Sequence, residues 1–329
     1  MEPFLHIVNS PAFLSILSTG GISSGDIKFI GDNFADGPIC DTQSAQEWKR
    51  SRLDFWRRET TTIGSNEKDL IFPDLDAHLP TSSICYWLGP DLSSAVCLAW
   101  LSSLYEHRRI TSKRLSIVPV FRHPRTGQPL PRVGLLQPGD IKWDQSLALA
   151  LQPDESVFLA KIWRAVTSDT PLLLDQLKAF AQPARLPIID AVRGLKFYFP
   201  LVSKGVSTVT LRILEILRGG RQPLSRVLTE YIVRFADEPS FYGDLALRRE
   251  LLALGSAKLS APLLNVTGSP ASTAEVSITS HGHDVLEGKL DHVHVNGIDR
   301  WVGGVHLDSS LNNIWRYDSQ SDRFLAEKK

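Results

Sequence analysis

Short apolar runs, each ending in a polar turn and followed by a helical segment, dominate the first part of this 329-residue sequence. The runs lie at residues 5–8, 27–30, 84–88 and 115–121, and helical spacing of apolar residues appears at 12–17, 46–59 and 93–107. Neighbouring parallel strands of a sheet are usually joined by a crossover helix. The alternation therefore predicts an α/β unit over residues 1–150, with a Rossmann-like half-sheet.

Polar loops follow three of these predicted strands. They contain Asn9 and Ser10, then the stretch from Asp32 through Asp36 and Gly37, and then Gly89. Ligands of open parallel sheets bind beyond the carboxyl ends of the strands. We therefore expect the three loops to line one crevice.

Two carboxylates and two arginines are the candidates for chemistry at that crevice. Asp32 and Asp36 would orient a ligand or take a proton, and Arg50 and Arg52 on the following helix would hold an anion. The alternatives are ordinary structure: turn residues in the loop, a solvated helix face, and a simple helix cap at Ser10.

Known nucleotide and hydrolase motifs are missing from the sequence. It has no GxGxxG, Walker or GxSxG pattern, so the motifs name no cofactor and leave both an enzyme and a binding protein open. Cys40 would be a nucleophile only if a histidine approached it.

Composition narrows the class of protein. Lys plus Arg equals Asp plus Glu at 36 each, so the net charge favours neither nucleic acid nor an anionic membrane as partner. Three scattered cysteines predict a reducing compartment, and the apolar stretch at 82–104 is too interrupted to span a membrane. The expectation is a cytoplasmic protein, whose oligomeric state the sequence does not indicate.

The second part, residues 151–329, is predicted to be mostly helical. Three helices near 208–217, 224–235 and 241–254 are followed by apolar runs at 262–266 and 275–279, which is winged-helix order. The third helix mixes Asp244 and Glu250 with Arg248 and Arg249, which favours packing or protein contact over DNA reading. A β-like segment at 292–295, a turn at Asn296-Gly297 and a strand at 301–307 predict a closing hairpin.

Two local clusters, one of basic residues and one of histidines, suggest further kinds of binding site. Seven Lys or Arg residues and no acidic residue lie between His107 and Gly139, which supports nucleic-acid contact only weakly because aromatic residues are scarce there. Five of the nine histidines lie within 281–306, with His292 and His294 placed on one strand face. Their spacing matches no zinc motif, so we predict no metal site.

Four segments also resemble a known family: LHIVNS, GDNFADGP, YWLGPDLSS and GIDRWVGGVHL, the last followed by WRYD. Together they are similar to an uncharacterised bacterial family described as a domain of unknown function. The resemblance spans nearly the whole chain. In that family the first strand often ends in a Gly-Asp-Ser type of turn, whereas Asn9-Ser10-Pro11 stands here, so a carboxylate role at that turn is not carried over. The resemblance implies no particular chemistry.

Three functions remain as hypotheses. The first is binding of a small anionic ligand, such as a nucleotide or phosphorylated metabolite, at the predicted crevice. The second is a ligand-responsive regulator whose winged-helix-like half contacts DNA or a protein. The third is a structural or interaction protein in which Arg300, Trp301 and Trp315 form a seam between the two halves.

Overall fold

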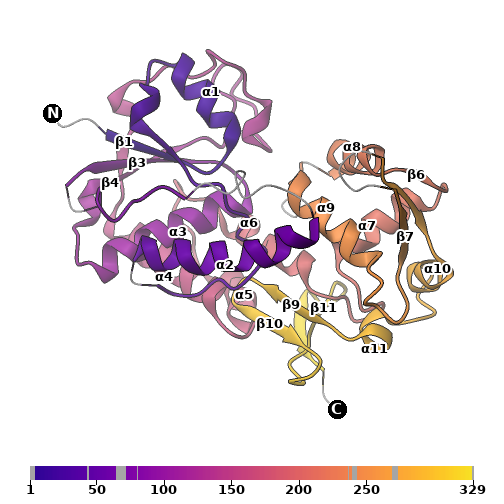
Figure 1. Ribbon diagram of the computed structural model, residues 1–329. Coiled ribbons are helices and arrows are strands. Elements are labelled where there is room, and N and C mark those ends of the chain that lie inside the picture. Colours follow the sequence, from indigo (N-terminus) through magenta and orange to yellow (C-terminus); the bar gives the residue numbers. More distant parts are fainter. Residues whose placement is uncertain are drawn as a thin grey trace.

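The chain folds into a mixed α/β structure with a mostly parallel sheet at its N-terminal end (Figure 1). The computed structural model describes residues 4–42, 44–63, 72–79, 81–235, 237–238, 243–268 and 273–327, without the side chains of 59–63, 244 and 245. No helix in these ranges is both long and apolar enough to cross a membrane.

Five strands form the front sheet in the order β2-β1-β3-β4-β5. The strands are β1 (Phe4–Val8), β2 (Ile27–Phe29), β3 (Ser83–Leu88), β4 (Leu115–Pro119) and β5 (Leu149–Ala150). The first four run parallel and β5 pairs antiparallel with β4. The predicted mostly parallel sheet is confirmed. From β1 the chain goes to β2 on one side and then returns to β3 on the other side of β1, so the direction of the strand order reverses between β1 and β3.

Helices cover both faces of this sheet. Apolar side chains of α1 (Pro11–Thr19) pack with Val8 and Trp87 on one face, together with the irregular segment around Val133. On the other face, α2 (Ala45–Ile63) and α3 (Leu92–His107) pack with Ile84 and Tyr86. Alternate residues of β3 thus serve opposite faces, as expected for a strand buried on both sides.

The core of the front sheet continues into the helices that follow it. Here α4 (Pro153–Thr167), α5 (Leu172–Gln176) and α6 (Ile189–Arg193) lie next, and α3 packs against α4 and α6. Short 3-10 turns lie at Ser24–Asp26, Ser112–Arg114, Val133–Leu135, Gln145–Leu147, Leu177–Ala179 and Gly194–Tyr198. The boundary near residue 150 stays a prediction, and apolar packing crosses it.

Three helices and a small antiparallel sheet follow. The helices α7 (Thr208–Leu217) and α8 (Leu224–Phe235) match the predicted ranges, and α9 (Asp244–Leu254) begins within its predicted range and ends with it. The strands β6 (Gln222–Pro223), β7 (Leu264–Thr267) and β8 (Glu275–Ile278) pair in the order β6-β8-β7, and α10 (Ser280–Leu286) comes next.

The predicted strand at 292–295 is wrong, because these residues form the short helix α11 (His292–Asn296). Asp291 caps it by accepting a hydrogen bond from the His294 N–H, and Gly297 ends it at a φ of 69°. The alternating His-Val pattern imitates a strand, but the caps on both sides determine a helical turn.

Two antiparallel hairpins close the chain. One joins β9 (Asp299–Val302) to β10 (Val305–Asp308) through Gly303-Gly304, and the other joins β11 (Trp315–Asp318) to β12 (Arg323–Ala326). A closing hairpin is therefore confirmed, but its turn lies at Gly303-Gly304 and not at Asn296-Gly297.

A buried histidine in β1 makes the fold sensitive to acid. His6 Nδ1 accepts a hydrogen bond from Trp87 Nε1 at 3.1 Å, and burial lowers its pKa to about 4 while nearby Asp26 opposes the shift. An unfolded histidine protonates near pH 6.5, so between about 6.5 and 4 the unfolded chain binds more protons. We expect the free energy of unfolding to fall by about 3 kcal/mol over that range through His6.

Denaturation of wild type and His6→Gln from pH 7 to pH 4 checks this expectation. Glutamine keeps an acceptor for Trp87 but does not titrate, so the variant should lose less stability on acidification. Burial also lowers the pKa of His292 to about 4, so the dependence should weaken without vanishing. Equal pH dependence of the two proteins would contradict the role of His6.

Candidate functional site

The loops after β1, β2 and β3 meet at one edge of the front sheet. The strands are parallel neighbours, and Ile30 N donates a hydrogen bond to Val8 O, which places Asp32 beside Asn9 at the strand ends. Gly89 follows β3 on the other side of β1. Asn9, Ser10, Asp32 and Gly89 are thus gathered at one edge, as expected for parallel strands.

A buried polar network joins β1 to the start of α3 at this edge. The Tyr86 hydroxyl lies 3.1 Å from Asn9 Oδ1 and 2.9 Å from the Ser94 carbonyl. Ser94 Oγ accepts a hydrogen bond of 2.7 Å from Gly89 N. The Asn9 side-chain nitrogen and the Ser10 hydroxyl, however, have no hydrogen-bond partner within the described part of the chain. These two groups are hydrogen-bond donors available to a ligand at the strand ends.

Asp91 is a carboxyl group that the sequence analysis did not select. It caps α3 by accepting a hydrogen bond from Ser94 N at 2.9 Å. Burial raises its pKa, against hydrogen bonds from backbone N–H groups that lower it. A buried carboxyl with a raised pKa at a strand end is a candidate for a functional group. The signal available in the sequence was the Gly-Pro-Asp turn before an apolar helix.

Asp32 and Arg52 form a buried ion pair. Arg52 Nε lies 2.7 Å from Asp32 Oδ2 and Nη2 lies 2.8 Å from Oδ1, and both side chains are completely buried. Trp56 Nε1 donates to Asp32 Oδ1, and Arg52 also donates to the carbonyls of Asn33 and Pro38. The two residues, both predicted to meet a ligand, bind each other, and together they tie the β2 loop to α2.

Arg50 lies apart from this pair. Two residues along a helix turn the side chain by about 200°, so Arg50 and Arg52 point to opposite sides of α2. Arg50 is exposed, whereas the side that carries Arg52 packs Trp48 and Trp56 into the interior. The structure therefore does not bring Arg50 to the strand ends.

Asp36 and Gly37 lie away from the strand edge, where the loop after β2 contacts the closing hairpin and α9. We call this contact the seam. Asp36 is fully buried and pairs with Arg249 of α9, and its Oδ1 lies 3.6 Å from Arg300 Nη2 of β9. Gly37 has a φ of 75°, and a Cβ there would lie 2.6 Å from the Phe55 ring. Only glycine fits this turn without displacing α2.

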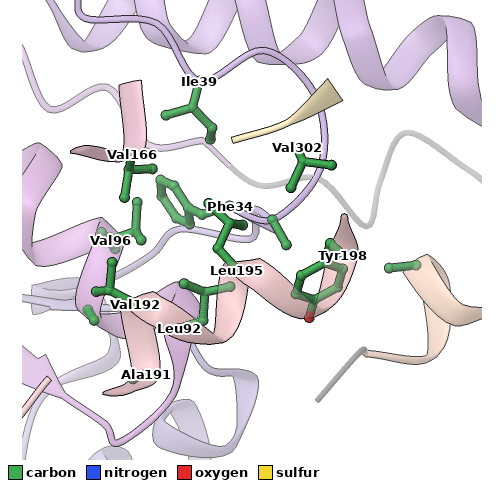
Figure 2. Close-up of a cluster of buried hydrophobic side chains, with 14 of the residues drawn as sticks. Phe34, Ile39, Leu92, Val96, Val166, Ala191, Val192, Leu195, Tyr198 and Val302 are labelled. Carbon is green, nitrogen blue, oxygen red and sulfur yellow. The ribbon is translucent and has the colours of Figure 1, made fainter. Parts of the chain in front are cut away.

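Backbone pairing completes this seam. Asp36 forms an antiparallel bridge with Val302, Ile39 N donates to Gly303 O, and Gly303 N donates to Ala35 O. Figure 2 shows Phe34 and Ile39 beside Val302, in a cluster that includes Val96 and Val166. The segments GDNFADGP and GIDRWVGGVHL, far apart in the sequence, are in direct contact.

The seam does not pass through Trp301 as predicted from the sequence. Trp301 is only half-buried and stacks on His306 of its own hairpin, with ring centroids 4.5 Å apart. Trp315 packs at the margin of the core. Arg300, Val302 and Gly303 make contacts to the loop after β2.

A cation not selected from the sequence comes near the strand ends. Val133 packs on the α1 face, and a Cβ on Gly89 would lie 2.8 Å from Val133 Cγ2. Arg132 is the residue before Val133, so its backbone lies near the Gly89 end of β3. Its Nε lies 3.9 Å from the exposed Asp237, a solvated pair that is weak and easily exchanged.

The clustered histidines lie in two places, and the rings of His281 and His292 are 6.0 Å apart. His292 and His294 lie on α11, while His306 lies with Asp299 and Asp308 on the hairpin β9–β10. These last three place one ligand atom each within 4.8 Å of one another, but His306 Nε2 is already hydrogen-bonded to Asp299 at 2.8 Å. Burial raises the pKa of Cys40, opposite to what an activated thiol needs.

Comparison with known proteins adds no family: no family model matches the chain, and no curated protein matches it. The resemblance described from the four sequence segments therefore stays a prediction. Function has to be argued from the geometry of the strand ends.

Proposed function

We propose that the protein binds a small anionic ligand at the carboxyl ends of β1 and β3. The observation that carries this proposal is the meeting of three polar loops where the strand order reverses direction. In the open parallel sheets of Rossmann-like and flavodoxin-like proteins, that is where ligands bind. The order β2-β1-β3-β4-β5 supports classing the front unit with them, apart from its antiparallel β5.

The ligand would meet part of the set expected from the sequence, Asn9 and Ser10, together with residues outside that set. Asn9 Nδ2 and the Ser10 hydroxyl offer donors, and Arg132 offers a charge that its exposed partner Asp237 holds weakly. Asp32 and Arg52 position the loop from beneath. Asp91, with its raised pKa, is the group best placed to exchange a proton if the protein is an enzyme.

A regulator is the second candidate, favoured by the topology of the second half. The elements follow in the order α7, β6, α8, α9, β7 and β8, and the first strand, β6, pairs with the last, β8. A winged helix has the same order, and α9 would be its recognition helix. In this structure, however, Arg249 of α9 is engaged with Asp36 and lies over the rings of Phe55 and Trp56. Reading of DNA by α9 would require the seam to open.

Thermal denaturation with phosphate, pyrophosphate, nucleoside monophosphates and small dicarboxylates, all at one ionic strength, tests the first candidate. A ligand present at about 100 times its dissociation constant adds about 2.7 kcal/mol of stability. We expect at least one anion to stabilise wild type in this way, and expect Asn9→Ala and Arg132→Ala to remove most of the effect.

Arg50→Ala is the matched control, because it removes the same charge from an exposed position of α2 that faces away from Arg52. Binding should survive in this variant. Loss of binding in Arg50→Ala but not in Arg132→Ala would overturn the residue assignment. No stabilisation by any of these anions would overturn the proposal itself.

A further inference from the structure

A polar groove lies in the second half of the molecule, between the end of α7, strand β6 and helix α8. Its volume is about 390 Å³, within the range of small-molecule sites. Charged and amide side chains line most of it: Glu215, Arg221, Gln222, Arg226, Glu230 and Arg234. None of them takes part in the strand-end site described above.

Two of the three arginines that line this groove already have acidic partners. Arg234 pairs with Glu230, and Arg221 Nε lies 2.5 Å from Glu275 Oε2. Arg226 is exposed and has no ion-pair or hydrogen-bond partner among the residues that the structure describes. A guanidinium in this position presents a free fork of donors, suited to phosphate or carboxylate oxygens.

Gln222 is a second groove residue with an unsatisfied hydrogen-bonding atom. Its Nε2 donates to the Ile216 carbonyl at 2.9 Å, which fixes the amide, while its Oε1 is buried without a partner in the described ranges. A buried acceptor without a donor costs about 1–3 kcal/mol. A ligand hydroxyl would satisfy it if the side chains that cover it moved aside.

We propose that this groove binds the phosphate ester of a small polyol, such as a sugar phosphate. Arg226 would hold the phosphate with help from Arg221, and Gln222 Oε1, Glu215 and Glu230 would accept hydrogen bonds from hydroxyl groups. No aromatic side chain is among the lining residues that the structure describes, so a nucleobase would have no described ring to stack on. The site favours a charged, hydroxyl-rich ligand over a nucleotide.

Isothermal titration with ribose 5-phosphate, inorganic phosphate and ribose tests the proposal on the full chain. We expect ribose 5-phosphate to bind most tightly, phosphate more weakly, and ribose most weakly. Arg226→Ala should weaken ribose 5-phosphate binding about tenfold or more, as expected for a lost charge-assisted hydrogen bond. Arg226→Lys, which keeps the charge but not the fork, should fall between.

Arg218→Ala is the control for unspecific charge effects, since Arg218 is exposed at the end of α7 and does not line the groove. Equal weakening by Arg218→Ala and Arg226→Ala would overturn the proposal. Undetectable binding of ribose 5-phosphate would also overturn it. Binding of a DNA duplex but of no small ligand would make the groove a nucleic-acid contact and would overturn it too. Asn9→Ala should leave this site unchanged, which separates its outcome from that of the strand-end site.

Discussion

Asp32→Asn is expected to lower the free energy of unfolding by about 3–5 kcal/mol, because it leaves the buried guanidinium of Arg52 without its counter-charge. Arg52 is completely buried between the rings of Trp48, Phe55 and Trp56. It cannot turn to water without opening this packing. Urea denaturation followed by tryptophan fluorescence measures the loss.

The double variant Asp32→Asn, Arg52→Met separates the ion pair from the packing. Methionine fills much of the volume of arginine without a charge, so the double variant should be more stable than Asp32→Asn alone. Arg50→Ala, on the exposed side of the same helix, should change stability by less than about 0.5 kcal/mol. A double variant less stable than the single one would show that Arg52 is not held by Asp32.

Asp36→Asn is expected to destabilise the protein by about 3 kcal/mol and to loosen the seam between the front loop and α9. Asp36 is fully buried, and the change removes the charge that faces Arg249 and Arg300. Arg300 also lies 2.9 Å from Glu250 Oε2, so part of its pairing survives. Hydrogen exchange should therefore rise in α9 and β9 before it rises in the front sheet.

Asp299→Asn is the matched control for this change. Asp299 begins the same hairpin strand as Arg300 but its side chain is 82% exposed, so its loss should cost little. If the two variants lose the same stability, or if exchange rises uniformly over the chain, Asp36 does not hold the seam.

The fold of the front unit followed from the sequence because local signals agreed with each other. The apolar runs at 5–8, 27–30 and 84–88 each end in turn residues and precede a helix, and all three became parallel strands. The helices α7 and α8 were predicted equally well, because their apolar spacing is regular. The helix α11 was missed because two caps outweigh the alternation of its five residues.

The contacts of the candidate site residues were harder to predict, because their partners lie far away in the sequence. Nothing near Asp36 indicates that Arg249, 213 residues later, will bury it. Asp32 and Arg52 were selected as ligand-binding residues because both are charged and close to a strand end. Spacing alone does not reveal that they neutralise each other.

The central claim, an anion site where β1 and β3 end, is tested most directly by soaking crystals of the protein in tungstate, an analogue of phosphate. The account predicts a peak of anomalous density within hydrogen-bonding distance of Asn9 Nδ2 or the Ser10 hydroxyl, on the side of Arg132. A map with peaks at other arginines, including Arg226, but none at these strand ends would contradict it.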